Sequence, residues 1–233
     1  MSVLAGSASA GVAVTMSARL HLGFLDLNGG LGRRFGSIGL AISEPRGRLT
    51  LRRARTTWVD GFESDRASRY LAAMRERLGI TGEHHLTVDE AIPPHAGLGS
   101  GTQLALGVAA ALRSLYDLAL NAPDDARFLN RGARSGVGIG LFETGGFVVD
   151  GGRGPESAAP PMISRMDFPE AWKAILVLDP TRQGVHGEPE RAAFRSLAPM
   201  PAADAADICR LVLMGVLPSV AEGDIASFGT AIT

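Results

Sequence analysis

Cysteine and lysine each occur only once in the chain. Cys209 has no second thiol to pair with, so an internal disulfide is impossible and a zinc site built on several cysteines is excluded. So few thiols are typical of a reducing compartment, and we expect a cytoplasmic protein. Cys209 lies in the apolar stretch at residues 208–213, which predicts a buried thiol.

Long apolar runs and an excess of one charge are also missing. Residues 1–18 carry no charged side chain, but they lack the basic start and the long apolar run of a secretory signal. The uncharged run at residues 96–112 contains Gly, Ser, Thr and Gln and is shorter than a membrane span. The net charge of −1 provides no field that would favour nucleic acid. We therefore expect neither a membrane segment nor a nucleic-acid partner.

Arginine supplies almost all of the positive charge. Of the 23 Lys and Arg residues, only Lys173 is a lysine. A GC-rich genome would explain this bias without any functional cause. Arginine nevertheless suits phosphate and carboxylate groups better than lysine does, because its guanidinium forms two parallel hydrogen bonds.

Hydrophobic periodicity and glycine turns predict an α+β protein. We expect strands at residues 19–24, 37–42, 84–90, 147–150 and 173–178, and a hairpin formed by residues 48–53 and 56–59. We expect helices at residues 64–78, 104–115, 123–131, 188–197 and 203–217. The first of these helices should end at Gly79.

The length and the order of these elements suggest two unequal domains. We expect a loose N-terminal extension at residues 1–16, a larger domain at residues 17–160 and a smaller unit at residues 171–233. The smaller unit contains a single expected strand, so it looks incomplete.

The strongest chemical signal is a glycine-rich loop between a predicted strand and a predicted helix. It reads Gly97-Leu98-Gly99-Ser100-Gly101-Thr102. The first turn of a helix has free N–H groups, glycine lets a phosphate approach them, and the hydroxyls of Ser100 and Thr102 can bind phosphate or a metal ion such as Mg²⁺. The loop lacks the Gly-Lys-Ser/Thr of a Walker A motif and the spacing of a dinucleotide fingerprint. A tight turn without function is the alternative.

This loop also carries a family resemblance. Pro94-His95-Ala96-Gly97-Leu98-Gly99-Ser100-Gly101 resembles the phosphate loop of the GHMP superfamily, which usually reads Pro-x-x-x-Gly-Leu-Gly-Ser-Ser. Two further stretches, residues 18–29 and 134–152, resemble the β-ribofuranosylaminobenzene 5′-phosphate synthase family within it. The three stretches occur in the same order as in that family.

The resemblance implies a ribosomal-S5-like N-terminal domain followed by a ferredoxin-like C-terminal domain, truncated here. It implies an enzyme that couples phosphoribosyl pyrophosphate to 4-aminobenzoate or 4-hydroxybenzoate. Carbon dioxide and pyrophosphate leave, and the C-riboside product enters tetrahydromethanopterin synthesis. Mg²⁺ on Ser100 and Thr102 would suit the pyrophosphate, no ATP is expected, and a homodimer stays open.

Two departures keep other functions open. GHMP kinases often carry Gly-x-x-Ser-Gly-x-Asp, but Gly138 occupies the aspartate position here. Glycine cannot accept a proton, which argues against an ATP-dependent small-molecule kinase. Family members are also longer and carry a third glycine-rich stretch, whereas this sequence stops at Thr233, so a truncated ligand-binding relative without activity is a third alternative.

We expect catalysis from residues near the first strand. Asp26 could stabilise positive charge at ribose C1, and Arg33 could hold a phosphate or the aryl carboxylate across the turn at residues 28–30. Asp26 as a simple turn residue is the alternative. Arg19 and His21 share one face of the strand. Arg19 is expected to bind phosphate, and His21 is either a proton carrier or a hydrogen-bonded strand histidine.

Further candidates lie in the second glycine-rich stretch and near the C-terminal unit. Arg134 and Ser135 are expected to contact phosphate, and Glu143 is expected to orient the arginines. Arg182 and His186 follow the last predicted strand and could close over the substrate. For each, an ordinary surface or loop position is the alternative.

Overall fold

The computed structural model describes residues 1–5, 11–157, 159–179, 184 and 187–233. The strands are β1 (Ser2–Ala5), β2 (Val12–Asp26), β3 (Phe35–Ala54), β4 (Trp58–Gly61), β5 (Glu83–Glu90), β6 (Phe147–Asp150) and β7 (Met162–Met166). The helices are α1 (Ser64–Leu78), α2 (Ser100–Leu115), α3 (Ala122–Phe128), α4 (Val137–Thr144), α5 (Glu188–Ser196), α6 (Ala202–Leu211), a π-helical segment (Val212–Val216), α7 (Leu217–Glu222) and α8 (Ile225–Ile232). The expected α+β class is confirmed.

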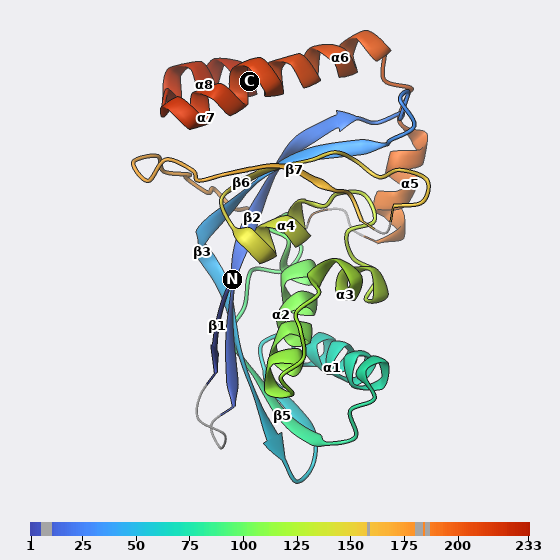
Figure 1. Cartoon of the computed structure of the whole chain (residues 1–233), viewed down its shortest axis with the longest axis vertical. Coiled ribbons are helices and arrows are strands. Elements are labelled where there is room, and N and C mark those ends of the chain that lie inside the picture. The colour runs from blue at the N-terminus through green and yellow to red at the C-terminus, as the bar shows by residue number, and fades with distance from the viewer. Residues whose placement is uncertain (6–10, 158, 180–183, 185–186) are drawn as a thin grey trace.

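A long antiparallel pair, β2 and β3, is the frame of the molecule (Figure 1). The sheet order is β1-β2-β3-β5-β4. The first half of β3 also pairs with β6, which pairs with β7, while its second half pairs with β5. In Figure 1, α1 to α4 lie along one face of the sheet, and α6, α7 and α8 lie together beyond one end of it.

Two clusters of buried side chains hold these layers together. One joins Val14, Met16 and Leu49 to the inner faces of α1 and α2. The other joins β3 and β6 to Val212, Val216 and other residues of the C-terminal helices. The C-terminal helices therefore share a core with the sheet, and the division at residues 160 and 171 stays a prediction.

Several elements match the expectation from the sequence. α1 and β6 have the predicted bounds, and Gly79 ends α1 in the left-handed conformation, with φ 66°. None of the helices in the described part of the chain has the length and apolar character needed to cross a bilayer.

The predicted N-terminal extension is wrong as a description of residues 12–16. They belong to β2, and Val12, Val14 and Met16 are buried at alternate positions. β1 pairs with this part of β2. The alternation was visible in the sequence, and it outweighs the absence of charge that suggested a loose tract.

The predicted hairpin and the last predicted strand are also wrong. β3 continues to Ala54 and pairs with β5, while β4 pairs with β5 in parallel. Residues 173–178 form no strand, and Ile175 and Val177 are exposed. Cys209 is exposed rather than buried, because α6 has no buried residue.

Gly107 is needed for the packing of α2 on β2. A Cβ atom there would lie 2.1 Å from Sδ of Met16. We expect Gly107→Ala to lower the free energy of unfolding by about 1–3 kcal/mol, since overpacking outweighs the better helix propensity. Gly229 in α8, whose Cβ would meet nothing within 4 Å, is the control. Urea unfolding should show Gly229→Ala at least as stable as the parent, and an equally stable Gly107→Ala would contradict the packing.

Candidate functional site

Two adjoining cavities of about 560 and 480 Å³ form one open cleft. Its walls are β2, the loop before α2, the loop after α3 and the start of α5. Both cavities are lined by Arg19, Gly97, Thr102, Arg131, Arg134, Gly187 and Glu190. The cleft therefore gathers most of the residues predicted from the glycine-rich stretches.

The loop before α2 is held in place by Arg19. The Arg19 backbone N–H donates to the Leu98 carbonyl at 3.0 Å, and Arg19 Nη1 donates to the Gly97 carbonyl at 2.9 Å. Among the described residues, no acceptor is paired with the amides of Gly99, Ser100 and Gly101. These three amides, at the positive end of the α2 dipole, form a binding position for an anion.

Two glycines give the loop its shape. Gly97 and Gly99 have φ of 76° and 79°, a left-handed conformation that residues with a side chain adopt only with strain. Gly99 has a second constraint, because a Cβ there would lie 2.7 Å from Cγ of Arg19. A Cβ at Gly97 would meet nothing within 4 Å. Both positions therefore favour glycine for its backbone conformation, but only position 99 also needs it for close packing.

The hydroxyl groups of the loop face the same cleft. Ser100 and Thr102 both line it, and neither hydroxyl has a described partner. The described residues contain no cluster of three or more His, Cys, Asp or Glu side chains that could hold a metal ion. The donors present fit Mg²⁺ only as an ion shared with ligand phosphates and water, with the hydroxyls as its protein ligands.

Four arginines surround the loop: Arg19, Arg66, Arg131 and Arg134. Arg131 Nη1 and Arg66 Nη1 lie 3.5 and 3.8 Å from the position of a Cβ on Gly101. Glu190 is the only carboxylate among the described residues that line the cleft. The positive charge therefore exceeds the negative, as an anion site requires.

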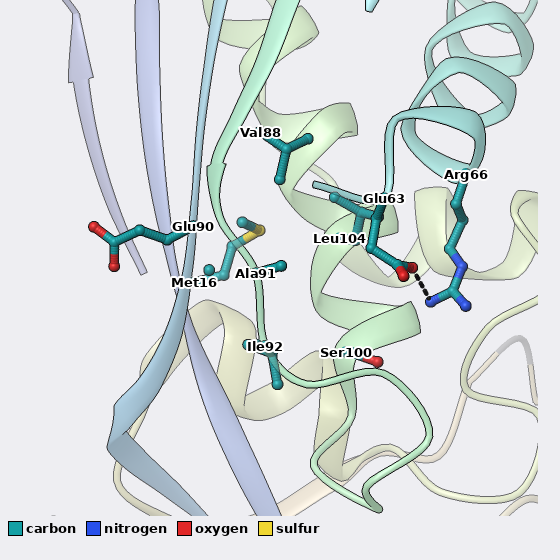
Figure 2. Close-up of a pocket in the computed structure, with 10 residues that line it drawn as sticks. Met16, Glu63, Arg66, Val88, Glu90, Ala91, Ile92, Ser100 and Leu104 are labelled. Carbon is teal, nitrogen blue, oxygen red and sulfur yellow. Dashed lines mark ion pairs between the residues drawn. The ribbon is translucent and has the colours of Figure 1, made fainter. Parts of the chain in front are cut away.

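Arg66 and Arg131 were missed by the sequence interpretation. Arg66 lies in the first turn of α1 and pairs with Glu63 at 2.9 Å. Figure 2 shows this pair beside a small apolar cavity lined by Met16, Leu104 and Ser100. Arg131 donates to the Tyr70 hydroxyl and lies over its ring. Only the adjacency of Arg131 to the second glycine-rich stretch could have suggested it.

His21 and Phe24 of β2 line the same cleft, with ring centroids 4.5 Å apart. Burial, with the neighbouring charges of Arg19 and Arg134, lowers the pKa of His21 to about 4. Its Nε2 atom is buried without a partner in the structure. His21 is therefore a neutral imidazole at pH 7 rather than a cation.

The second glycine-rich stretch is organised by Asp150. This buried carboxylate accepts hydrogen bonds from Ser37 Oγ at 2.5 Å and from the Gly136 and Gly152 amides at 2.9 Å. The Ser135 hydroxyl is 2.6 Å from that of Ser37 and is thereby tied to the same group. Ser135 lines the cleft.

Asp26 and Arg33 do not line the cleft. The Asp26 carboxylate accepts from the amides of residues 28–30, and these bonds, that of Gly29 above all, lower its pKa. Arg33 donates to the carbonyls of Gly151 and Gly152 at 2.8 and 2.9 Å. Their catalytic pairing stays a prediction, and the contacts described here are those of a turn and a loop brace.

Glu143, another candidate from the sequence, does not line the cleft. Glu143 lines a separate cavity of about 210 Å³ with Met1 and Phe142, and burial raises its pKa. Its expected role toward the arginines has no described contact to support it. Arg182 and His186 lie outside the described residues.

The fold belongs to a known class. The GHMP kinases N terminal domain family matches residues 65–145. Phosphomevalonate kinase of Streptococcus pneumoniae has a TM-score of 0.68 at 12% identity, covering 96% of this chain and 77% of its own. Homoserine kinase of Cytophaga hutchinsonii has a TM-score of 0.60 at 15% identity, covering 99% and 73%. These similarities show the GHMP fold.

Sequence comparison narrows the class further. The β-ribofuranosylphenol 5′-phosphate synthase of Archaeoglobus fulgidus is 38% identical, over 92% of this chain and 72% of its own length. That of Methanothermobacter thermautotrophicus is 34% identical, over 94% and 73%. The chain belongs to the β-ribofuranosylphenol 5′-phosphate synthase family.

The different constraints on Gly97 and Gly99 give a matched pair of variants. Gly97→Ala and Gly99→Ala both place alanine at positive φ, at a cost of about 1–2 kcal/mol each. Only Gly99→Ala displaces Arg19. We expect calorimetry to show pyrophosphate binding about tenfold or more weaker in Gly99→Ala and nearly unchanged in Gly97→Ala. Equal losses in two folded variants would show that Arg19 does not hold the loop for the ligand.

The lowered pKa of His21 predicts a pH-dependent stability. His21 takes up a proton near pH 4 when folded but near its ordinary value of 6.5 when unfolded. Its contribution is therefore present above pH 6.5 and is lost as the pH falls toward 4. Between pH 7 and pH 5, the free energy of unfolding measured with urea should fall by up to about 2 kcal/mol more in the parent than in His21→Gln. An equal fall of the unfolding free energy in the parent and in His21→Gln would mean that His21 has an ordinary pKa in the folded protein.

Proposed function

We propose that this chain couples phosphoribosyl pyrophosphate to 4-hydroxybenzoate, giving a β-ribofuranosylphenol 5′-phosphate for tetrahydromethanopterin synthesis. The observation that carries the proposal is the anion position formed by the free amides of residues 99–101 beside Arg131. The names of the relatives support the phenol product and hence 4-hydroxybenzoate rather than 4-aminobenzoate.

The cleft suits a reaction in which pyrophosphate leaves. The bond from ribose C1 to the pyrophosphate oxygen breaks, and the oxygen keeps the electron pair. The ring carbon that bears the carboxylate bonds to ribose C1, and carbon dioxide leaves with its bonding electrons returned to the ring. The amides and arginines stabilise the leaving group, where negative charge grows in the transition state. Mg²⁺ on Ser100 and Thr102 would neutralise further charge.

A kinase is less well supported by the same cleft. Gly138, at the position of the kinase aspartate, would place a Cβ 3.2 Å from Cγ2 of Thr102, and Gln103 donates to its carbonyl. The one carboxylate among the described lining residues, Glu190, is paired with Arg134. No carboxylate among the described residues that line the cleft is thus free to accept a proton from an alcohol, and we propose that ATP is not a substrate.

Product formation tests this proposal. The protein is incubated with Mg²⁺, phosphoribosyl pyrophosphate and either 4-hydroxybenzoate or 4-aminobenzoate, and carbon dioxide release is measured. A parallel reaction supplies ATP and small alcohols and measures ADP. We expect carbon dioxide and no ADP. Steady ADP formation would favour the kinase, and no product in either reaction would favour a ligand-binding relative.

Arg131 provides a test of the site within the active protein. Arg131→Gln should lower kcat/KM about 10- to 100-fold, because a contact to the leaving group is lost. Arg210→Gln removes the same charge from an exposed position on α6 and should leave kcat/KM unchanged. Equal activity of the two variants would place pyrophosphate elsewhere.

The cellular location completes the proposal. We place the enzyme in the cytoplasm, since its single cysteine suits a reducing compartment.

A further inference from the structure

One end of the cleft differs in chemistry from the phosphate loop. We call it the aromatic end and define it by His21, Phe24, Arg134, Glu190 and Phe194, which all line the larger cavity. The rings of Phe24 and Phe194 meet edge to face with centroids 5.7 Å apart. A phosphate gains nothing from such rings, whereas a flat aromatic ligand does.

Arg134 already has both kinds of contact that an aryl carboxylate would offer. Its guanidinium lies over the Phe194 ring, with Cζ 4.6 Å from the centroid. Arg134 Nη2 is 2.6 Å from Oε1 of Glu190. Glu190 and Phe194 are four residues apart on α5, so they lie on one side of the helix. An aromatic group and a carboxylate thus meet on one arginine.

The position of Arg134 also fits the reaction. Arg134 lines both cavities and therefore lies where the aromatic end meets the phosphate loop. A carboxylate held there would put the ring carbon that bears it toward the pyrophosphate, where ribose C1 becomes reactive.

We propose that the aromatic end is the acceptor subsite: the benzoate ring packs against Phe24 and Phe194, and its carboxylate replaces that of Glu190 on Arg134. This inference rests on the proposed function and adds the residues that bind the second substrate. Glu190 then competes with the benzoate carboxylate for Arg134. The alternative, from the sequence, is that Arg134 contacts phosphate.

Removing the Glu190 carboxylate distinguishes the two roles of Arg134. If Arg134 binds the benzoate carboxylate, the removal should make benzoate binding tighter. Calorimetry on the full chain measures binding of 4-hydroxybenzoate, phenol and pyrophosphate. Glu190→Gln should bind 4-hydroxybenzoate about 3- to 10-fold more tightly, and phenol with unchanged affinity because it has no carboxylate. The gain should be absent in the Arg134→Gln/Glu190→Gln double variant. Phe194→Leu should weaken 4-hydroxybenzoate binding and leave pyrophosphate binding intact.

Two outcomes would overturn the subsite. Weaker 4-hydroxybenzoate binding by a folded Glu190→Gln would show that Glu190 supports the site, and a gain larger for pyrophosphate would assign Arg134 to phosphate. Thermal unfolding checks that each variant is folded. Binding does not depend on turnover, so an inactive protein that shows this benzoate series would refute the proposed reaction and still support the subsite.

Discussion

The attachment of Arg19 to the loop before α2 is the contact on which the site depends. Arg19 uses its backbone and its side chain to bind two consecutive carbonyls, those of Gly97 and Leu98. In a trans peptide the C=O and the following N–H point in opposite directions, so the Gly99 amide is directed away from the Arg19 backbone that holds the Leu98 carbonyl. The close approach of the Arg19 stem in turn requires glycine at position 99. The longest strand pair of the sheet thus orients the amides that receive the anion.

Asp150 plays the corresponding part on the opposite wall. A buried carboxylate without partners would be strongly destabilising, but Asp150 has donors from β3, from the start of α4 and from the turn after β6. This network places Ser135, next to Arg134, on the cleft. Each wall is therefore organised by a charged side chain that forms several hydrogen bonds, most of them to the backbone.

The sequence predicted what depends on local pattern and missed what depends on distant contacts. α1 and the glycine loop could be predicted because periodicity, Gly79 and the glycine spacing are local signals. The catalytic role of Asp26 stays a prediction, and the three backbone amides that donate to its carboxylate are a feature that its place in a turn could not reveal. Arg131 reaches the loop from beyond α3, and Phe194 reaches the larger cavity from α5, so no spacing in the sequence connects them.

The excess of positive charge in the cleft links binding to stability. Arg19 is so buried that desolvation lowers its pKa, and Glu190 only partly offsets that effect. Arg131 keeps a buried Nε atom without a partner. Cations held together in a partly desolvated cleft repel one another, since Glu190 is the only carboxylate among the described residues that line it. A polyanionic ligand would supply the missing negative charge, and relief of this repulsion would contribute to its binding free energy.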